Sequence, residues 1–147
     1  MKLSTRSRYG VRLILELAMN YDKGPVQLNT IAKNQDISEK YLGQLVIQLK
    51  SAGVITAVRG KNGGYLLSKE PRNLTLREVI EKLEGDLCLV ECMTGAVNCE
   101  RTDFCITRDI WRELSLRMVE YLDSVTMQDL VDKTFNAKND NNCIYEI

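Results

Sequence analysis

Two amphipathic segments joined by a tight turn, between residues 29 and 52, set the strongest limit on the fold of this 147-residue chain. The first segment predicts a short helix over residues 29–35. Ser38 is a good N-cap for a second helix that runs to Ala52 and ends at Gly53. The apolar positions of this second helix recur at steps of three and four residues: Leu42, Leu45, Val46 and Leu49. The pair predicts a helix-turn-helix, and a generic helical hairpin with the same periodicity is the alternative.

A predicted β-hairpin follows this pair directly. Residues 54–58 and 65–67 have strand character, and the turn over residues 59–64 contains three glycines. Arg59 and Lys61 lie at the tip of the hairpin. Glycines permit positive φ and close backbone approach, and an arginine at the tip fits the narrow, negative minor groove of DNA. The hairpin predicts the wing of a winged helix-turn-helix, with an ordinary solvated hairpin as the alternative.

Four further helices complete the expected fold class, which is mainly α with a small β-hairpin wing. The first covers Thr5–Tyr21, and another begins after the capping-box residue Thr75 and ends at Gly85. A long helix with an apolar stripe, over residues 107–122, spans about 24 Å at 1.5 Å per residue. Its stripe needs a partner surface, and a second copy of the chain supplies one in DNA-binding dimers, which bind two-fold-related half-sites. A short helix begins near residue 127.

These elements divide the chain into four parts. Residues 1–72 form a DNA-binding domain, and residues 73–106 hold the linking helix and a cysteine-containing loop. Residues 107–135 contain the dimerisation helix and the short C-terminal helix, and residues 136–147 form a flexible tail. The N-terminus lacks the apolar segment of a signal peptide, and no apolar run approaches the roughly 20 residues that span a bilayer. We expect a cytoplasmic protein without a membrane partner, in which cysteines are reduced, metal-bound or redox-active.

The net charge is zero, but it is divided unevenly along the chain. Residues 1–72 contain 12 Lys and Arg against 5 Asp and Glu, a net charge of +7, and residues 73–147 contain 8 against 15, a net charge of −7. This asymmetry suggests that the basic half contacts nucleic acid, and attraction between the two halves is the alternative. The absence of histidine excludes Ser/His/Asp and Cys/His catalysis and HExxH metal sites. We therefore expect a protein that is not an enzyme, with a cysteine-dependent enzyme or a metal-trafficking protein as the remaining alternative class.

Four cysteines lie between the linking helix and the long helix: Cys88, Cys92, Cys99 and Cys105. The last three are separated by six and five intervening residues. Thiolates favour zinc, copper(I) and iron–sulfur clusters, and spacings this wide are unlike the CxxC pairs of structural zinc sites. The spacing predicts a metal or cluster site. A thiol redox switch, a disulfide pair and buried packing cysteines are the alternatives.

Several motifs together resemble the Rrf2 family of bacterial transcription regulators. These motifs are Arg8-Tyr9, Ile37-Ser38, Tyr41-Leu42, Val58-Arg59-Gly60, Gly63-Gly64-Tyr65-Leu66-Leu67, Trp111 and Asp129-Leu130-Val131. The cysteine loop is most similar to that of the IscR type, and the resemblance covers about residues 1–134. It implies a homodimeric winged-helix repressor of iron–sulfur cluster biogenesis or related stress genes. It also implies a two-iron two-sulfur (2Fe-2S) cluster held by Cys92, Cys99 and Cys105.

The chain departs from that family in its fourth cluster ligand and in one residue of the recognition helix. The IscR type takes a fourth cluster ligand from a histidine three residues after the last cysteine, where this chain has Arg108. Nitric-oxide-sensing members use an N-terminal aspartate, where this chain has Arg8. The second departure is Gly43, in place of a glutamate that faces the bases, so we expect a different operator preference. The fourth ligand is open between an exogenous small molecule and four side chains, Cys88, Asp103, Glu100 and Glu91.

The expected DNA contacts come from the recognition helix, the wing and the first helix. They are Arg6, Arg8, Ser38, Lys40, Tyr41, Gln44, Arg59 and Lys61. A glutamine such as Gln44 can pair bidentately with adenine, while the wing cations hold the DNA backbone and minor groove. A dimer predicts a palindromic operator in double-stranded DNA, with half-sites about one helical turn apart or a multiple. The alternative function is a regulator of the same fold without a cluster, which senses thiol redox state or cysteine metabolism.

Overall fold

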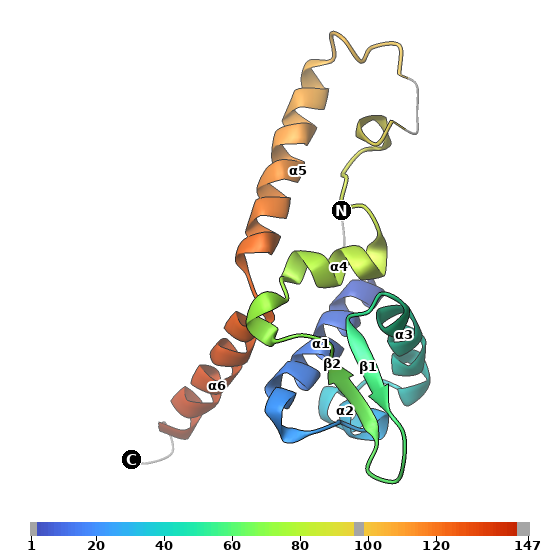
Figure 1. The fold of residues 1–147 in the computed structure, drawn as a ribbon. Coiled ribbons are helices and arrows are strands. Elements are labelled where there is room, and N and C mark those ends of the chain that lie inside the picture. Colours follow the sequence, from blue (N-terminus) through green and yellow to red (C-terminus); the bar gives the residue numbers. More distant parts are fainter. Residues whose placement is uncertain (1–2, 96–98, 144–147) are drawn as a thin grey trace.

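The computed structural model describes residues 3–95 and 99–143, and within them it places six α-helices and one antiparallel pair of strands (Figure 1). The helices are α1 (Thr5–Met19), α2 (Leu28–Gln35), α3 (Glu39–Ser51), α4 (Leu76–Glu84), α5 (Ile106–Ser124) and α6 (Met127–Cys143). The strands are β1 (Ile55–Val58) and β2 (Gly64–Leu67), and 3₁₀ turns occupy Tyr21–Lys23, Pro71–Asn73 and Glu91–Met93. The order of elements confirms the predicted fold class, mainly α with a small hairpin.

The turn between α2 and α3 is built from local caps. Asp36 ends α2 in the left-handed conformation, with φ at 50°, which aspartate tolerates better than most residues. The backbone N–H of Ile37 donates to the carbonyl of Ala32 at 3.1 Å. The Ser38 hydroxyl then accepts from the backbone N–H of Tyr41 at 3.2 Å. This bond confirms the predicted role of Ser38 as the N-cap of α3.

The wing is a short antiparallel hairpin that is fastened to the segment before α2. Its register places Val58 opposite Gly64. Next to that pair, Tyr65 exchanges two backbone hydrogen bonds with Val26, at 2.9 and 3.0 Å. Gly64 has φ of 157°, and a Cβ there would lie 2.4 Å from the Val26 carbonyl oxygen. Only glycine therefore lets the two backbones approach this closely.

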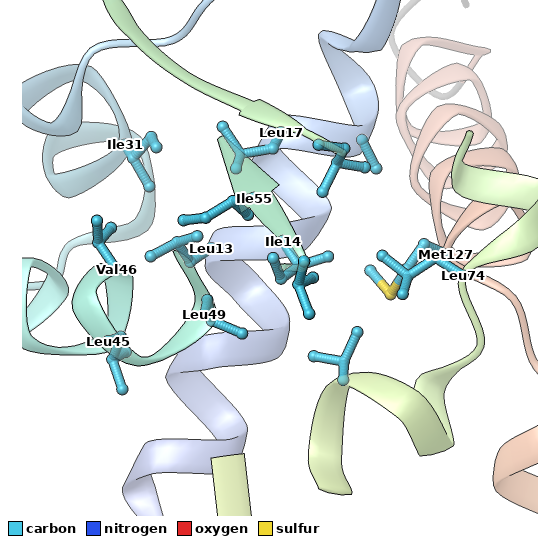
Figure 2. Close-up of a cluster of buried hydrophobic side chains, with 14 of the residues drawn as sticks. Leu13, Ile14, Leu17, Ile31, Leu45, Val46, Leu49, Ile55, Leu74 and Met127 are labelled. Atoms are coloured by element: carbon cyan, nitrogen blue, oxygen red, sulfur yellow. The ribbon is translucent and has the colours of Figure 1, made fainter. Parts of the chain in front are cut away.

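α1 is the central helix of the hydrophobic core. Leu13 and Ile14 are fully buried and Leu17 nearly so, and each such side chain contributes about 1.5–3 kcal/mol through burial. Figure 2 shows them between the side chains of α2, α3 and β1 on one side and Leu74 and Met127 on the other. The core includes the predicted inner face of α3, formed by Leu42, Leu45, Val46 and Leu49.

The first turns of α6 belong to the same core, although α5 separates them from it in sequence. Met127 is fully buried and Val131 is 5% exposed. Two backbone hydrogen bonds of 2.8 Å hold the returning chain: Leu76 donates to the carbonyl of Val125, and Met127 donates to that of Leu74. The chain therefore leaves the core after α4 and comes back to it at α6.

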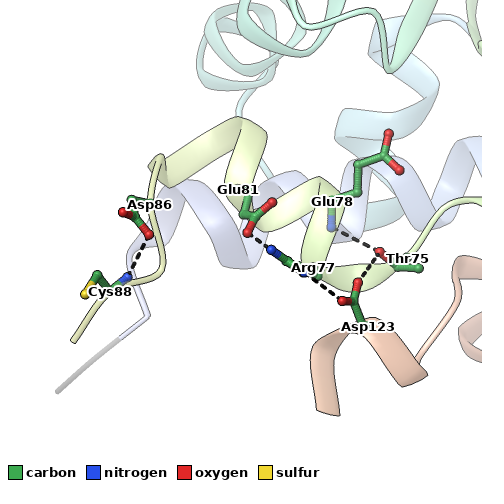
Figure 3. Close-up of polar contacts among 7 residues, drawn as sticks. All are labelled: Thr75, Arg77, Glu78, Glu81, Asp86, Cys88 and Asp123. Carbon is green, nitrogen blue, oxygen red and sulfur yellow. Dashed lines mark hydrogen bonds and ion pairs between the residues drawn. The ribbon is translucent and has the colours of Figure 1, made fainter. Parts of the chain in front are cut away.

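Arg77 ties α4 to the C-terminal end of α5 (Figure 3). Its guanidinium lies 2.8 Å from a carboxylate oxygen of Glu81 and 2.8 Å from one of Asp123. The hydrogen bond to Glu81, and to a smaller degree the one to Asp123, holds the pKa of Arg77 above its ordinary value. Thr75 caps α4 by accepting from the backbone N–H of Glu78 at 3.2 Å, as its capping-box sequence predicts.

α5 projects away from the core, and the cysteine loop lies at its far end (Figure 1). Ile106 is 80% exposed and Ile110 is 56% exposed. Other large apolar side chains of α5 that are exposed are Trp111, Leu114, Leu116 and Tyr121. Exposed apolar surface of this extent marks an interaction site. Among the helices that the structure describes, none is long and apolar enough to cross a membrane.

The last helix is longer than predicted. We expected a short helix within residues 107–135 and a tail over residues 136–147, but α6 continues to Cys143, and residues 144–147 lie outside the described part of the chain. Thr126 and Asp129 start the helix as a reciprocal capping box, with N–H to side-chain oxygen distances of 2.7 and 3.2 Å. No glycine or proline follows Gly95 in the sequence, so nothing stops the helix where its residues become polar.

Candidate functional site

The recognition helix α3 presents polar side chains on the face opposite the core. Ser38, Lys40 and Gln44 are exposed, as predicted. Tyr41 is half-buried, and its ring meets that of Tyr9 from α1 edge to face, with centroids 5.8 Å apart. The first turn of α3 is thus packed against α1 while its polar side faces solvent.

Gly43 leaves open space on this face of α3. A Cβ at this position would have only the Leu28 side chain within 4 Å, at 3.9 Å. The helix therefore accepts a larger residue here. The absence of a side chain at this position is therefore not required by the packing of the helix.

Gln48 has a structural partner that the sequence did not reveal. Its amide donates to the carbonyls of Lys82 and Leu83, at 3.0 and 2.9 Å. These carbonyls belong to the last turn of α4, where helix carbonyls lack partners within the helix. Because the cysteine loop begins directly after α4, Gln48 links the recognition helix to the start of that loop.

The two predicted DNA-binding arginines of α1 are both exposed but have different surroundings. Arg6 donates to the carbonyl of Leu83 at 3.2 Å, so it also closes the end of α4. The guanidinium carbon of Arg8 lies 5.9 Å from the centre of the Tyr9 ring. Arg8 is therefore next to the aromatic pair that supports α3, whereas Arg6 is engaged at α4.

The two predicted wing cations, Arg59 and Lys61, are exposed at the tip of the hairpin. Within residues 3–95 and 99–143, neither side chain forms an ion pair with a carboxylate. The backbone carbonyl of Lys61 accepts from the Gln27 side chain at 3.4 Å, which connects the tip to the segment before α2. Cations in this arrangement suit contacts with phosphates.

The three predicted cluster ligands lie on the loop between α4 and α5. Cys92 belongs to the 3₁₀ turn Glu91–Met93, and Cys105 is the N-cap residue of α5. These two and Cys99 are half-buried free thiols. Among the described residues, no three cysteine, aspartate or glutamate side chains come close enough together to hold a metal ion. The described part of the loop therefore carries free thiols that are not grouped around a common point.

The thiol of Cys105 lies beside a hydroxyl group at the start of α5. Its Sγ lies 3.3 Å from the Thr107 hydroxyl, and this hydrogen bond lowers the pKa of the Cys105 thiol. The backbone N–H of Arg108, at the start of α5, lowers it further. Of the four proposed fourth ligands, Asp103 is the one that lines the same surface hollow as Cys105.

The candidates for a fourth ligand differ in their contacts. The thiol of Cys88 donates to the carbonyl of Val90 at 3.4 Å, and Cys88 lines an apolar groove with Trp111 and Leu114. Its backbone N–H donates to Asp86 at 3.2 Å (Figure 3). The remaining candidates are exposed carboxylates, Glu91, Glu100 and Asp103.

Arg108 occupies the position where the IscR type has its histidine. It is half-buried, and its Nε has no hydrogen-bond partner among the described residues. A guanidinium remains protonated and has no acceptor atom, so Arg108 cannot bind a metal ion. Arg108 therefore supplies no ligand at this position of the sequence.

A family model described as an iron-dependent transcriptional regulator, Rrf2, matches residues 3–133. The chain belongs to the Rrf2 family. Among its relatives, the HTH-type transcriptional regulator IscR of Klebsiella pneumoniae (strain 342) is 37% identical over 132 residues, which cover 90% of this chain and 80% of that protein. As an Rrf2 protein, the chain is a DNA-binding transcription regulator and not an enzyme.

Two solved structures share the fold of this Rrf2 chain. CymR (YrzC), described as the global cysteine regulator of B. subtilis, has 35% sequence identity and a TM-score of 0.79, over 90% of this chain and 98% of that one. IscR of T. potens has 35% identity and a TM-score of 0.78, over 93% of this chain and 90% of that one. The helices and hairpin described above are therefore arranged as in other Rrf2 regulators.

Proposed function

We propose that this Rrf2 regulator is a homodimeric repressor of genes for iron–sulfur cluster biogenesis or related stress, controlled by an iron–sulfur cluster held by Cys92, Cys99 and Cys105. The observation that carries the proposal is the position of these thiols on one loop between α4 and α5. α4 contacts the recognition helix through Gln48, and α5 carries the exposed apolar side chains. A change in the loop would act on both elements. Because the protein acts on DNA, we place it in the cytoplasm.

The proposed DNA-binding face combines α3, the wing and the start of α1. Gln44 would pair with adenine in the major groove, and Arg59 would enter the minor groove. The net charge of +7 over residues 1–72 supports this assignment, because phosphate contacts dominate affinity for DNA. The full set of proposed contacts is Arg6, Arg8, Ser38, Lys40, Tyr41, Gln44, Arg59 and Lys61.

The proposed dimer forms through α5. Ile106, Ile110 and Leu114 follow one another at steps of four residues, so they lie along one side of the helix. Pairing with the same stripe of a second copy would remove this apolar surface from water. A two-fold dimer presents two recognition helices to a palindromic operator, with half-sites about one helical turn apart or a multiple.

The chemistry of the loop suits the proposed cluster, since thiolates are the usual protein ligands of iron–sulfur clusters. A bound 2Fe-2S cluster would supply an iron- and redox-sensitive link between parts of the loop. Binding requires Cys92, Cys99 and Cys105 to converge, which would order the loop that leads into the N-terminal end of α5. We propose that this ordering sets the spacing of the two recognition helices in the dimer. The fourth ligand would come from Cys88, Asp103, Glu100 or Glu91, or from an exogenous small molecule.

The test measures iron content, visible absorption and DNA affinity on one anaerobic sample. We expect a coloured protein whose visible absorption disappears in Cys92→Ser, Cys99→Ser and Cys105→Ser. Cys143→Ser, which lies outside the loop, is the matched control and should keep the colour. Colourless, iron-free protein after anaerobic reconstitution would refute the cluster. Affinity for duplex DNA should fall steeply with added salt, and a flat salt dependence would refute the proposed DNA-binding face.

A second candidate function is a regulator that senses thiol redox state or cysteine metabolism without a cluster. The likeness to CymR favours it, as does the lowered pKa of the Cys105 thiol, because the thiolate is the reactive form. This function predicts colourless protein whose DNA affinity changes after treatment with a thiol oxidant and returns with a reductant. Cys105→Ser should abolish that change.

A further inference from the structure

We infer that Glu16 is a positioning residue for DNA recognition, which acts through Gln35, Arg12 and Tyr9 on the first turn of the recognition helix. The inference rests on the proposed DNA-binding face, of which α3 is the centre. Glu16 lies on α1, is 5% exposed and is not among the proposed DNA contacts. Its role would be to hold the residues that are.

The carboxylate of Glu16 fastens the C-terminal end of α2 to α1. Its two oxygens each accept one amide hydrogen bond, from Asn34 and from Gln35, both at 2.7 Å. Each carboxylate oxygen is thus engaged as an acceptor by a different residue of α2. Because both bonds run from one side chain of α1 to the last two residues of α2, the network fixes the position of the C-terminal end of α2 against α1.

Gln35 carries the constraint from Glu16 to Arg12. Its side-chain oxygen accepts from Arg12 Nε at 3.0 Å, and its backbone carbonyl accepts from the same guanidinium. Since the amide nitrogen of Gln35 donates to Glu16 and the amide oxygen accepts from Arg12, the side chain cannot flip without losing both bonds. Gln35 is the last residue of α2, directly before the left-handed Asp36. Two side chains of α1 thus hold the turn that leads into α3.

Arg12 also supports the aromatic pair against which α3 packs. Its guanidinium carbon lies 5.6 Å from the centre of the Tyr9 ring, and Tyr9 packs edge to face on Tyr41. The backbone N–H of Tyr41 donates to Ser38, so Tyr41 is part of the N-cap of α3. The first turn of α3 is therefore held twice, through the turn before it and through the ring of Tyr41.

The test compares sequence-specific with non-specific DNA binding by the full chain. The specific probe is a duplex about three helical turns long that the wild-type protein selects from a random library. The non-specific probe is a random duplex of equal length. Glu16→Met keeps the length of the side chain but removes both carboxylate oxygens, so the amide nitrogen of Gln35 loses its partner on α1. We expect Glu16→Met to bind the selected duplex about tenfold more weakly and to bind the random duplex within about twofold of wild type.

The controls separate a positioning role from a loss of fold. Glu70→Gln changes an exposed carboxylate that pairs with Arg72 at 3.0 Å, and it should bind both duplexes like wild type. Arg12→Lys keeps the charge at a half-buried site but loses the guanidinium that donates to Gln35 at two points. It should therefore lower the affinity for the selected duplex only. Tyr9→Phe keeps the ring and should keep wild-type affinity. If Glu16→Met does not fold, Arg12→Lys decides the question, with Glu70→Gln and Tyr9→Phe as its controls.

Two outcomes are distinguished by the wild-type protein itself. If wild type selects no duplex, the proposed DNA-binding face is refuted and the inference falls with it. If wild type selects a duplex, but Glu16→Met and Arg12→Lys bind it as tightly as wild type or bind both duplexes more weakly to the same degree, the inference alone is overturned.

Discussion

Two glycines in the middle of helices, Gly10 and Gly43, have opposite surroundings. A Cβ at Gly10 would lie 2.2 Å from Cδ1 of Leu83, so glycine at this site lets α1 and α4 approach closely. At Gly43 the nearest atom outside the helix would be that of Leu28, at 3.9 Å. Glycine in a helix interior costs about 1 kcal/mol relative to alanine, and only at Gly10 does packing offset this cost.

Gly43→Ala should therefore raise the free energy of unfolding by about 0.5–1 kcal/mol, measured by urea denaturation. Gly43→Glu should also fold, but its carboxylate should weaken binding to DNA phosphates and shift the selected operator toward bases that donate to a carboxylate, such as cytosine. Gly10→Ala is the matched control and should lower the free energy of unfolding. Destabilisation by Gly43→Ala would show that position 43 is not open.

Glu84 links the end of α4 to the start of α1. Its carboxylate accepts hydrogen bonds from the hydroxyls of Ser4 and Ser7, which hold the pKa of Glu84 below its ordinary value of 4.5. A lowered pKa in the folded state means that the unfolded chain binds the proton more readily. The stabilisation from Glu84 is therefore complete at neutral pH and is lost as the pH falls through the folded-state pKa.

Ser7→Ala should remove part of this pH-dependent stability. We expect the free energy of unfolding to fall by about 1 kcal/mol at neutral pH, and the loss of stability between about pH 6 and about pH 3 to be smaller than in wild type. Urea denaturation at both pH values measures the two effects. Ser68→Ala, at an exposed serine, is the control and should leave the pH dependence unchanged. An unchanged pH dependence in Ser7→Ala would contradict the role given to Glu84.

At the scale of the element, α5 carries the exposed apolar stripe through which the proposed dimer would form. Ile110→Glu places a charge in the exposed apolar stripe, so we expect a monomer by analytical ultracentrifugation. Its affinity for operator DNA should fall by about tenfold or more, because one recognition helix replaces two. Lys133→Glu adds negative charge on an exposed part of α6 and should remain dimeric. A dimeric Ile110→Glu protein would show that another surface pairs the subunits.

The sequence could predict those elements whose boundaries depend on nearby residues. The caps at Ser38 and Thr75 and the inner face of α3 follow from spacing within one turn, and the structure confirms them. The length of α6 could not be predicted in this way, because polar residues resemble a tail unless tertiary packing holds the start of the helix. Met127, the first residue of α6, supplies that packing by its burial against residues such as Leu74, which is distant in the sequence.

At the scale of the whole molecule, the candidate site also combines features that depend on nearby residues with features that depend on tertiary packing. The exposure of Gln44, Arg59 and Lys61 could be predicted from helix and hairpin patterns. The bonds of Gln48 to α4 and of Glu16 to α2 could not, because they depend on where a second helix ends. The assignment of Cys92, Cys99 and Cys105 as ligands stays a prediction, since their side chains do not form a common site among the described residues.

The return of α6 to the core has a consequence for how this protein can be taken apart. Residues on both sides of the cysteine loop, such as Leu74 and Met127, pack into one core and share backbone hydrogen bonds. A cut within the loop would leave two fragments that complement each other and stay associated. The loop and α5 thus form an insertion between two segments of the same core. Exposed insertions of this kind tolerate changes of length and sequence. A different sensing module could be grafted between α4 and α6 of this chain without interrupting its DNA-binding core.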